Sequence, residues 1–181
     1  MNDDFSIALK YALRFEGGYV NDPVDPGGAT NKGITQGKYN EWLLAKGFPP
    51  RSVAGITEQE VVQIYHEEFW MKFKCGYLPT PLSIAVFDFC VNAGANGAKR
   101  LQRVLGMKKD AIDGVIGNNT LKAVRDFAST PTRTMDLLKA YQRGRKAYYY
   151  NIVTRKPSQA RFIKGWLRRV DELSELIGVV A

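Results

Sequence analysis

Three acidic side chains lying close together in the sequence could carry out acid–base chemistry. Glu16 comes directly before Gly17-Gly18, and Asp22 and Asp25 follow in a loop rich in glycine and proline. Cleavage of a glycosidic bond needs an acid on one side of the bond and a second carboxylate across it, as base or nucleophile. Glu16 and Asp25 are far enough apart along the chain to lie on opposite walls of a cleft, so this pair suits that reaction.

A helix over residues 3–15 is expected to position Glu16. Its apolar face, at helical spacing, consists of Phe5, Ala8, Leu9 and Ala12. The next position on this face is residue 16, and Gly17-Gly18 would end the helix. Partial burial and the negative end of the helix dipole would both favour an uncharged carboxyl, the form that a general acid requires. The alternative is a helix-end glutamate that turns outward to solvent.

The loop after Glu16 has the composition of a turn region between two short strands. Its turn-forming pairs are Asp22-Pro23, Asp25-Pro26 and Gly27-Gly28. Residues 19–20 and 33–35 could pair as strands on either side. Ordinary turn chemistry is the favoured interpretation of Asp22, whereas catalysis is favoured for Asp25.

Two segments of the chain resemble a known family. Glu16-Gly17-Gly18-Tyr19 and the run DPGGATNKGIT over residues 25–35 look like the signature of glycoside hydrolase family 108. Members of this family are N-acetylmuramidases, found as phage endolysins and as secretion-associated bacterial lysozymes. Weaker similarity to the family extends through residues 64–70, 87–94, 101–102, 113–120 and 165–170. The resemblance therefore covers nearly the whole chain.

The resemblance implies a mainly α, lysozyme-like α+β fold with a small β-hairpin after the first helix and a helical C-terminal lobe. Residues 1–78 would form the catalytic lobe. Residues 79–181 would form a helical lobe that resembles a predicted peptidoglycan-binding region, and both would pack as one globular unit. The implied reaction is hydrolysis of the β-1,4 bond between N-acetylmuramic acid and N-acetylglucosamine in the bacterial wall.

The resemblance also assigns roles to individual residues. Glu16 matches the catalytic glutamate of the family, and Asp25 matches its second acidic position. Related phage lysozymes place a threonine shortly after that aspartate, where it helps to position water. The corresponding residue here is Asn31, with Thr30 one residue earlier, and we carry the role to Thr30. Asn31 and Thr35 remain alternatives, although Thr35 is better explained as the N-cap of the next helix.

Competing chemistries lack the residues that they need. A zinc amidase needs three protein ligands, but the chain has a single histidine, His66, followed by Glu67-Glu68, which is not a zinc-protease motif. Serine and cysteine peptidases would depend on that same histidine. We therefore expect neither a metal nor a cofactor. The open alternatives are a lytic transglycosylase, which needs one acid/base and leaves an anhydro sugar, and a non-catalytic basic wall-binding protein.

Charge is unevenly distributed along the chain. Residues 1–99 contain 9 Lys/Arg and 11 Asp/Glu, whereas residues 100–181 contain 17 and 7. The basic half could contact an anionic partner such as the bacterial envelope, and a solvated basic surface without a specific partner is equally compatible. No nucleic-acid-binding motif accompanies the charge, so nucleic acid is not expected as a partner. The expected partner is the glycan strand of peptidoglycan, bound by a monomer.

Three further features concern location and redox state. No run of about 18 apolar residues is present, so we expect no stable membrane insertion. The acidic start of the chain, residues 1–4, lacks the profile of a signal peptide. We expect synthesis in a bacterial host cytoplasm and action on the wall after release, through a holin in the phage setting that the resemblance implies.

Two cysteines, Cys75 and Cys90, do not make a disulfide framework, and Cys90 is expected to be a reduced core residue.

Apolar periodicity predicts eight helices. Their ranges are 3–15, 36–46, 58–73, 81–94, 97–105, 119–128, 133–153 and 158–176. Thr57 and Glu60 form a capping-box pattern before the third. The helix over 81–94 is expected to be central and buried, with Asp88 off its apolar stripe, either orienting a neighbour by hydrogen bonding or facing solvent. The last helix is expected to pack on the core and display its arginines.

Overall fold

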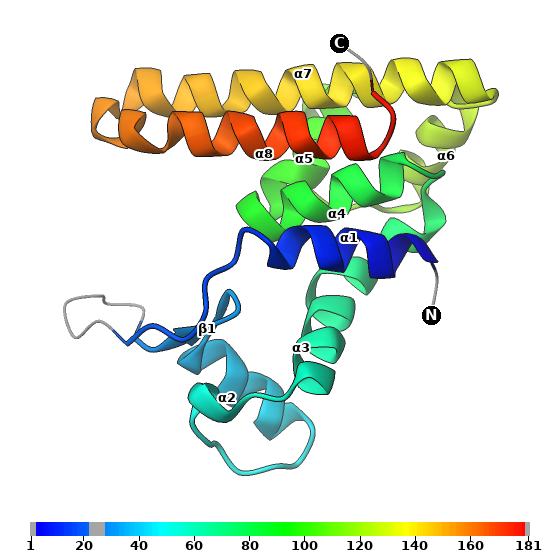
Figure 1. The fold of residues 1–181 in the computed structure, drawn as a ribbon. Coiled ribbons are helices and arrows are strands. Elements are labelled where there is room, and N and C mark those ends of the chain that lie inside the picture. The colour runs from blue at the N-terminus through cyan, green and yellow to red at the C-terminus, as the bar shows by residue number, and fades with distance from the viewer. Residues whose placement is uncertain (1–2, 22–27, 180–181) are drawn as a thin grey trace.

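The computed structural model describes residues 3–21 and 28–179 of the 181-residue chain. Asp22 and Asp25 therefore lie outside the described residues. Within them the chain is mainly helical, with a small β-hairpin after the first helix and a C-terminal lobe built from helices (Figure 1). These features confirm the predicted fold class.

The first helix ends earlier than predicted. Helix α1 spans Asp3–Leu13, and its predicted apolar face is buried. The N–H groups of Arg14 and Phe15 bond to carbonyls three residues back, at 3.1 and 3.0 Å, so the last turn tightens and the chain leaves the helix axis. The prediction that Glu16 continues the helical stripe is therefore wrong, because Glu16 lies in the bend beyond this turn.

The hairpin consists of β1 (Thr30–Asn31) and β2 (Ile34–Thr35), which pair antiparallel. Lys32 and Gly33 form the two-residue turn, with φ of 50° and 76°, as a tight hairpin turn of this kind requires. The predicted pairing of residues 19–20 with 33–35 is wrong, since Val20 forms its bridge with Thr30.

Helices α2 (Gln36–Ala45) and α3 (Glu58–Tyr65) follow the hairpin, and both begin at side-chain caps. The hydroxyl of Thr35 accepts a hydrogen bond from the Lys38 amide at 3.3 Å, which confirms its predicted role as an N-cap. Thr57 and Glu60 form the predicted capping box. Helix α3 continues directly into a π-helical segment, η2 (His66–Met71). Short 3-10 helices stand at η1 (Val53–Gly55) and η3 (Cys75–Tyr77).

The remaining helices form the C-terminal lobe. They are α4 (Leu82–Ala93), α5 (Ala95–Val104), α6 (Asn118–Phe127), α7 (Pro131–Arg155) and α8 (Ile163–Leu176), with 3-10 segments η4 (Lys109–Ala111) and η5 (Pro157–Phe162). Helices α7 and α8 lie side by side as an antiparallel pair, and α1 packs against α4 (Figure 1). The predicted eighth helix corresponds to η5 and α8 together. None of the helices in the described ranges is long and apolar enough to cross a membrane.

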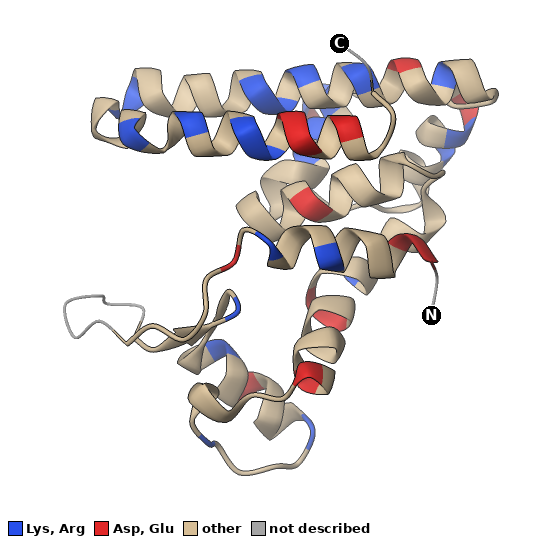
Figure 2. Cartoon of the chain, viewed as in Figure 1, with Lys and Arg blue, Asp and Glu red and all other residues tan. Residues whose placement is uncertain are grey.

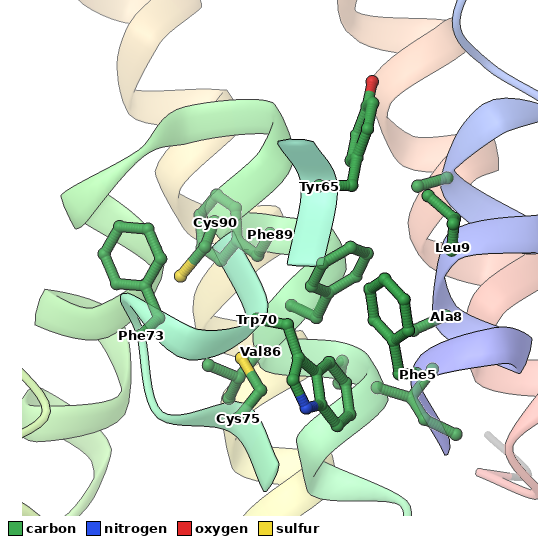
Figure 3. Close-up of a cluster of buried hydrophobic side chains, with 14 of the residues drawn as sticks. Phe5, Ala8, Leu9, Tyr65, Trp70, Phe73, Cys75, Val86, Phe89 and Cys90 are labelled. Atoms are coloured by element: carbon green, nitrogen blue, oxygen red, sulfur yellow. The ribbon is translucent and has the colours of Figure 1, made fainter. Parts of the chain in front are cut away.

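Helix α4 forms the centre of the core. Every residue from Leu82 to Cys90 is buried, which confirms the prediction of a central helix. Phe5 of α1 meets the ring of Trp70 edge-on, with centroids 5.4 Å apart, in the cluster shown in Figure 3. Cys75 and Cys90 are buried free thiols, so the expected reduced state of Cys90 is confirmed.

Candidate functional site

A hollow of about 220 Å³ lies between the segment after α1 and the β-hairpin. Its lining consists of Glu16, Gly17, Gly18, Val20, Gly28, Thr30 and Gly33. The structure thus brings together two of the three predicted site residues, Glu16 and Thr30. The third, Asp25, belongs to the segment between Asn21 and Gly28 that lies outside the described residues.

Gly33 lets the hairpin turn approach Glu16 closely. A Cβ on this residue would lie 2.6 Å from the Tyr65 hydroxyl and 2.7 Å from Glu16 Oε2. The Tyr65 hydroxyl donates a 2.8 Å hydrogen bond to the carbonyl of Lys32, and the Lys32 amide bonds to the carbonyl of Gly17 at 3.1 Å. Burial and the nearby Glu16 carboxylate raise the pKa of Tyr65, so its hydroxyl stays a hydrogen-bond donor. These contacts hold the turn, α3 and the Glu16 segment together.

Adjacent residues of β1 point in opposite directions. Asn31 is buried, and its side-chain amide donates to the carbonyls of Val53 and Ala54 at 3.1 and 3.4 Å. Thr30 lines the hollow, where its hydroxyl lies 3.5 Å from the carbonyl of Gly28. Of the alternatives considered for the third site residue, Thr30 is therefore the one that shares the hollow with Glu16. Its part in catalysis stays a prediction.

A cation from the C-terminal lobe contacts Glu16. Nη1 of Arg169, in α8, lies 3.3 Å from Glu16 Oε1, and its guanidinium stands 5.0 Å from the ring centroid of Phe15. The side chain of Arg169 is only 6% exposed, against 23% for Glu16. The expectation that the last helix displays its arginines is wrong for this residue. The charged group beside Glu16 is therefore a buried guanidinium, and not the negative end of a helix dipole as the sequence suggests.

Arg169 is itself held by a buried carboxylate. Nε and Nη2 of Arg169 donate to Asp88 Oδ1 at 3.1 and 2.8 Å, and Nη1 of Arg145 lies 2.7 Å from Asp88 Oδ2. Asp88 is completely buried. Burial by itself would raise the pKa of Asp88, but the two guanidiniums outweigh it and hold this pKa below its usual value. The expectation that Asp88 orients a neighbour by hydrogen bonding is confirmed.

Arg145 anchors the far end of this network. Its side chain is fully buried in α7, and its Nε donates to the Tyr149 hydroxyl at 3.0 Å. That hydroxyl donates in turn to Asn92 Oδ1 at 2.6 Å. The Arg145 guanidinium also stands 4.8 Å from the ring centroid of Phe89. We call the connected side chains of Arg145, Asp88, Arg169 and Glu16 the ionic chain.

Sequence reasoning missed both arginines of the ionic chain, although a signal was present. Arg169 follows Trp166 by three residues and precedes Leu173 by four, so it falls on the apolar face of its helix. Arg145 follows Tyr141 by four residues and precedes Tyr149 by four, also on a buried face. A basic residue on a buried face needs a buried carboxylate partner. Asp88, the one charged residue on a mostly apolar helix, is the candidate.

Elsewhere in the described residues, no group of three or more His, Cys, Asp and Glu side chains is placed to hold a metal ion. A second hollow, of about 210 Å³, lies in the C-terminal lobe beside Gln102 and Asp113. The Gln102 amide donates to Asp113 Oδ1 at 2.7 Å and accepts from the Gly114 amide at 2.9 Å, so these groups shape a turn.

Family models and a solved structure are similar to this chain. Residues 9–94 match the family model described as glycosyl hydrolase 108, and residues 96–171 match the model of a predicted peptidoglycan domain. Among solved structures, that of Brucella abortus SagA is similar, with a TM-score of 0.73 and 32% sequence identity over 98% of this chain and 95% of that chain. None of the curated proteins compared with the chain matches it.

Proposed function

Because the chain belongs to glycosyl hydrolase family 108, a family of peptidoglycan hydrolases, we propose that it is an N-acetylmuramidase. It would cleave the β-1,4 bond between N-acetylmuramic acid and N-acetylglucosamine. The observation that carries this proposal is the position of Glu16, held in a hollow with Thr30 and Gly33. The partner is the glycan strand of peptidoglycan, and we expect the enzyme to work as a monomer.

The proposed mechanism begins with proton transfer from Glu16. The carboxyl gives its proton to the glycosidic oxygen, the bond from the sugar C1 to that oxygen breaks, and its electron pair stays on the oxygen. Glu16 is left as a carboxylate. Water then adds to C1. Asp25 acts across the cleft, either as the base that takes the proton of that water or as electrostatic support for the oxocarbenium-like transition state, in which case the Glu16 carboxylate takes the proton. Thr30 helps to hold that water or the loop.

The test is digestion of purified peptidoglycan by the wild type and by Glu16→Gln. Identification of new sugar ends by mass spectrometry after borohydride reduction should find reducing N-acetylmuramic acid ends from the wild type. Loss of the general acid should lower turnover by roughly 10²- to 10⁴-fold. Glu41→Gln is a matched control, because that side chain is 74% exposed on α2.

Other products would support other functions. Anhydro ends would make the protein a lytic transglycosylase, while binding to peptidoglycan without any new ends would identify a non-catalytic wall-binding protein. Asp25→Asn, in the same digestion, should be severely impaired. Full activity of that variant would remove Asp25 from the mechanism.

A further inference from the structure

We propose that Arg169 is a positioning residue for Glu16, so that the C-terminal region completes the active site as well as binding the wall. This inference rests on the proposed role of Glu16 as the acid. Glu16 lies in the part of the chain that matches the glycosyl hydrolase model, whereas Arg169 lies in the part that matches the predicted peptidoglycan domain. The contact between them spans 153 residues of sequence.

Glu16 needs an anchor because its backbone provides little. It stands three residues beyond the end of α1 and is followed by Gly17 and Gly18, outside any helix or strand. Gly17 and Gly18 have no side chains to pack, and no atom of the described residues would lie within 4 Å of a Cβ on either of them. Among the contacts of the described residues, the hydrogen bond donated to the Glu16 carboxylate comes from Arg169.

The two oxygens of Glu16 have different surroundings. Oε1 accepts from Nη1 of Arg169 at 3.3 Å, while Oε2 faces Gly33 beside the hollow. A guanidinium can only donate hydrogen bonds, so Oε1 must act as an acceptor in the acid form as well. The acid proton therefore sits on Oε2, the oxygen directed at the hairpin. Arg169 thus selects the oxygen that delivers the proton to the glycosidic oxygen.

The charges of Arg145, Arg169 and Asp88 do not cancel among themselves. Arg145 and Arg169 carry two positive charges in the protein interior, and Asp88 carries one negative charge between them. The charge of Arg169 is balanced in full only when Glu16 is a carboxylate, which is its state after proton transfer. An arginine suits this position because its planar fork donates in two directions at once, to Asp88 through Nε and Nη2 and to Glu16 through Nη1.

The test compares Arg169→Gln and Arg169→Lys with the wild type in steady-state cleavage of soluble glycan strands. We expect kcat to fall by about ten- to a hundredfold in Arg169→Gln, since misplacing a catalytic group by about 1 Å has an effect of that size. The KM should change much less, because Arg169 stands behind Glu16. Arg169→Lys retains the charge beside Asp88 and should recover part of kcat.

Arg168→Gln is the matched control, because Arg168 is the neighbour of Arg169 on α8 but is 70% exposed. It should keep the wild-type kcat. Thermal unfolding of each variant shows whether a lower kcat reflects lost folding or lost positioning of Glu16. If Arg169→Gln does not fold, the kcat of Arg169→Lys tests the positioning role instead. A folded Arg169 variant with wild-type kcat, alongside an inactive Glu16→Gln, would overturn the positioning role alone. An active Glu16→Gln would instead overturn the proposed function.

Discussion

At the scale of single residues, strand alternation decides which side chains of the hairpin can reach the hollow. Successive residues of a strand point to opposite faces, so Asn31 packs against the Val53 carbonyl while Thr30 lines the hollow. A shift of the strand register by one residue would turn Asn31 toward the hollow and Thr30 away from it. The bridge between Val20 and Thr30 fixes that register from the outer side. Neighbouring residues of similar polarity therefore have separate tasks.

This separation makes Thr30→Ala and Thr35→Ala an informative pair of variants. Thr30→Ala should lower the rate of peptidoglycan cleavage by about tenfold or more, because the hydroxyl is expected to hold water or the loop near the bond. Its free energy of unfolding should scarcely change, since among the described residues the hydroxyl makes a single hydrogen-bond contact, of 3.5 Å, with the Gly28 carbonyl at the surface. Thr35→Ala should lose about 0.5–2 kcal/mol of stability with its cap on α2 and keep its activity.

Guanidinium chloride titration would measure the free energy of unfolding, and release of reducing ends would measure the cleavage rate, on the same preparations of each variant. If Thr35→Ala were the inactive and stable variant of the two, the role assigned to Thr30 would pass to Thr35.

At the scale of helices and strands, the sequence predicts what depends on nearby residues. The apolar periodicity located all eight α-helices of the described residues, and the caps at Thr35 and Thr57 were found because a cap and its partner lie within one turn. The end of α1 was missed by two residues, since a tightened last turn leaves the periodicity intact. The Glu16–Arg169 contact depends on how α8 lies against α1 and α4, which no local pattern contains.

The buried ion pairs of the ionic chain connect helices α4, α7 and α8. The free energy of unfolding should therefore depend on pH. The pKa of Asp88 is lower in the folded protein than its usual value of about 4. Its ion pairs therefore contribute stability that is fully present above that value and is lost as the pH falls through the lower folded value. Asp88→Asn should destabilise the protein by about 3–5 kcal/mol at neutral pH, because two buried guanidiniums lose their counter-charge.

Urea unfolding at pH 7, 4 and 3 would check this dependence. The difference in unfolding free energy between wild type and Asp88→Asn should shrink as the pH falls, because Asp88 of the unfolded wild type takes up a proton at a higher pH than Asp88 of the folded protein does. Asp110→Asn serves as the control, since Asp110 is exposed in η4. A difference that stayed constant down to pH 3 would mean that shape, and not charge, makes Asp88 necessary.

At the scale of the whole molecule, the positive charge gathers on one part of the fold. Lys and Arg recur along α7 and α8 (Figure 2), and no acidic residue occurs between Asp136 and Asp171. Four exposed basic residues surround the turn between these helices, namely Arg155, Lys156, Arg161 and Lys164. None of the four forms an ion pair within residues 3–21 and 28–179. We propose that this turn contacts the anionic envelope and adds to the affinity for whole walls.

The position of the basic residues, rather than the net charge of the molecule, should then determine the affinity for walls. The double variant Lys156→Gln/Arg161→Gln should bind purified walls about three- to tenfold more weakly at low salt, since exposed charges contribute about 0.2–1 kcal/mol each. Lys10→Gln/Lys72→Gln removes the same charge from exposed positions in the first half of the chain and should bind almost normally. Cosedimentation with walls measures the affinity, and cleavage of short soluble glycans should be equal in both variants.

Salt near 1 M should abolish the difference in wall affinity between the two double variants, because it shortens the screening length to about 3 Å. Equal weakening in the two double variants would show that only the net charge of the molecule matters and that the turn between α7 and α8 has no contact of its own.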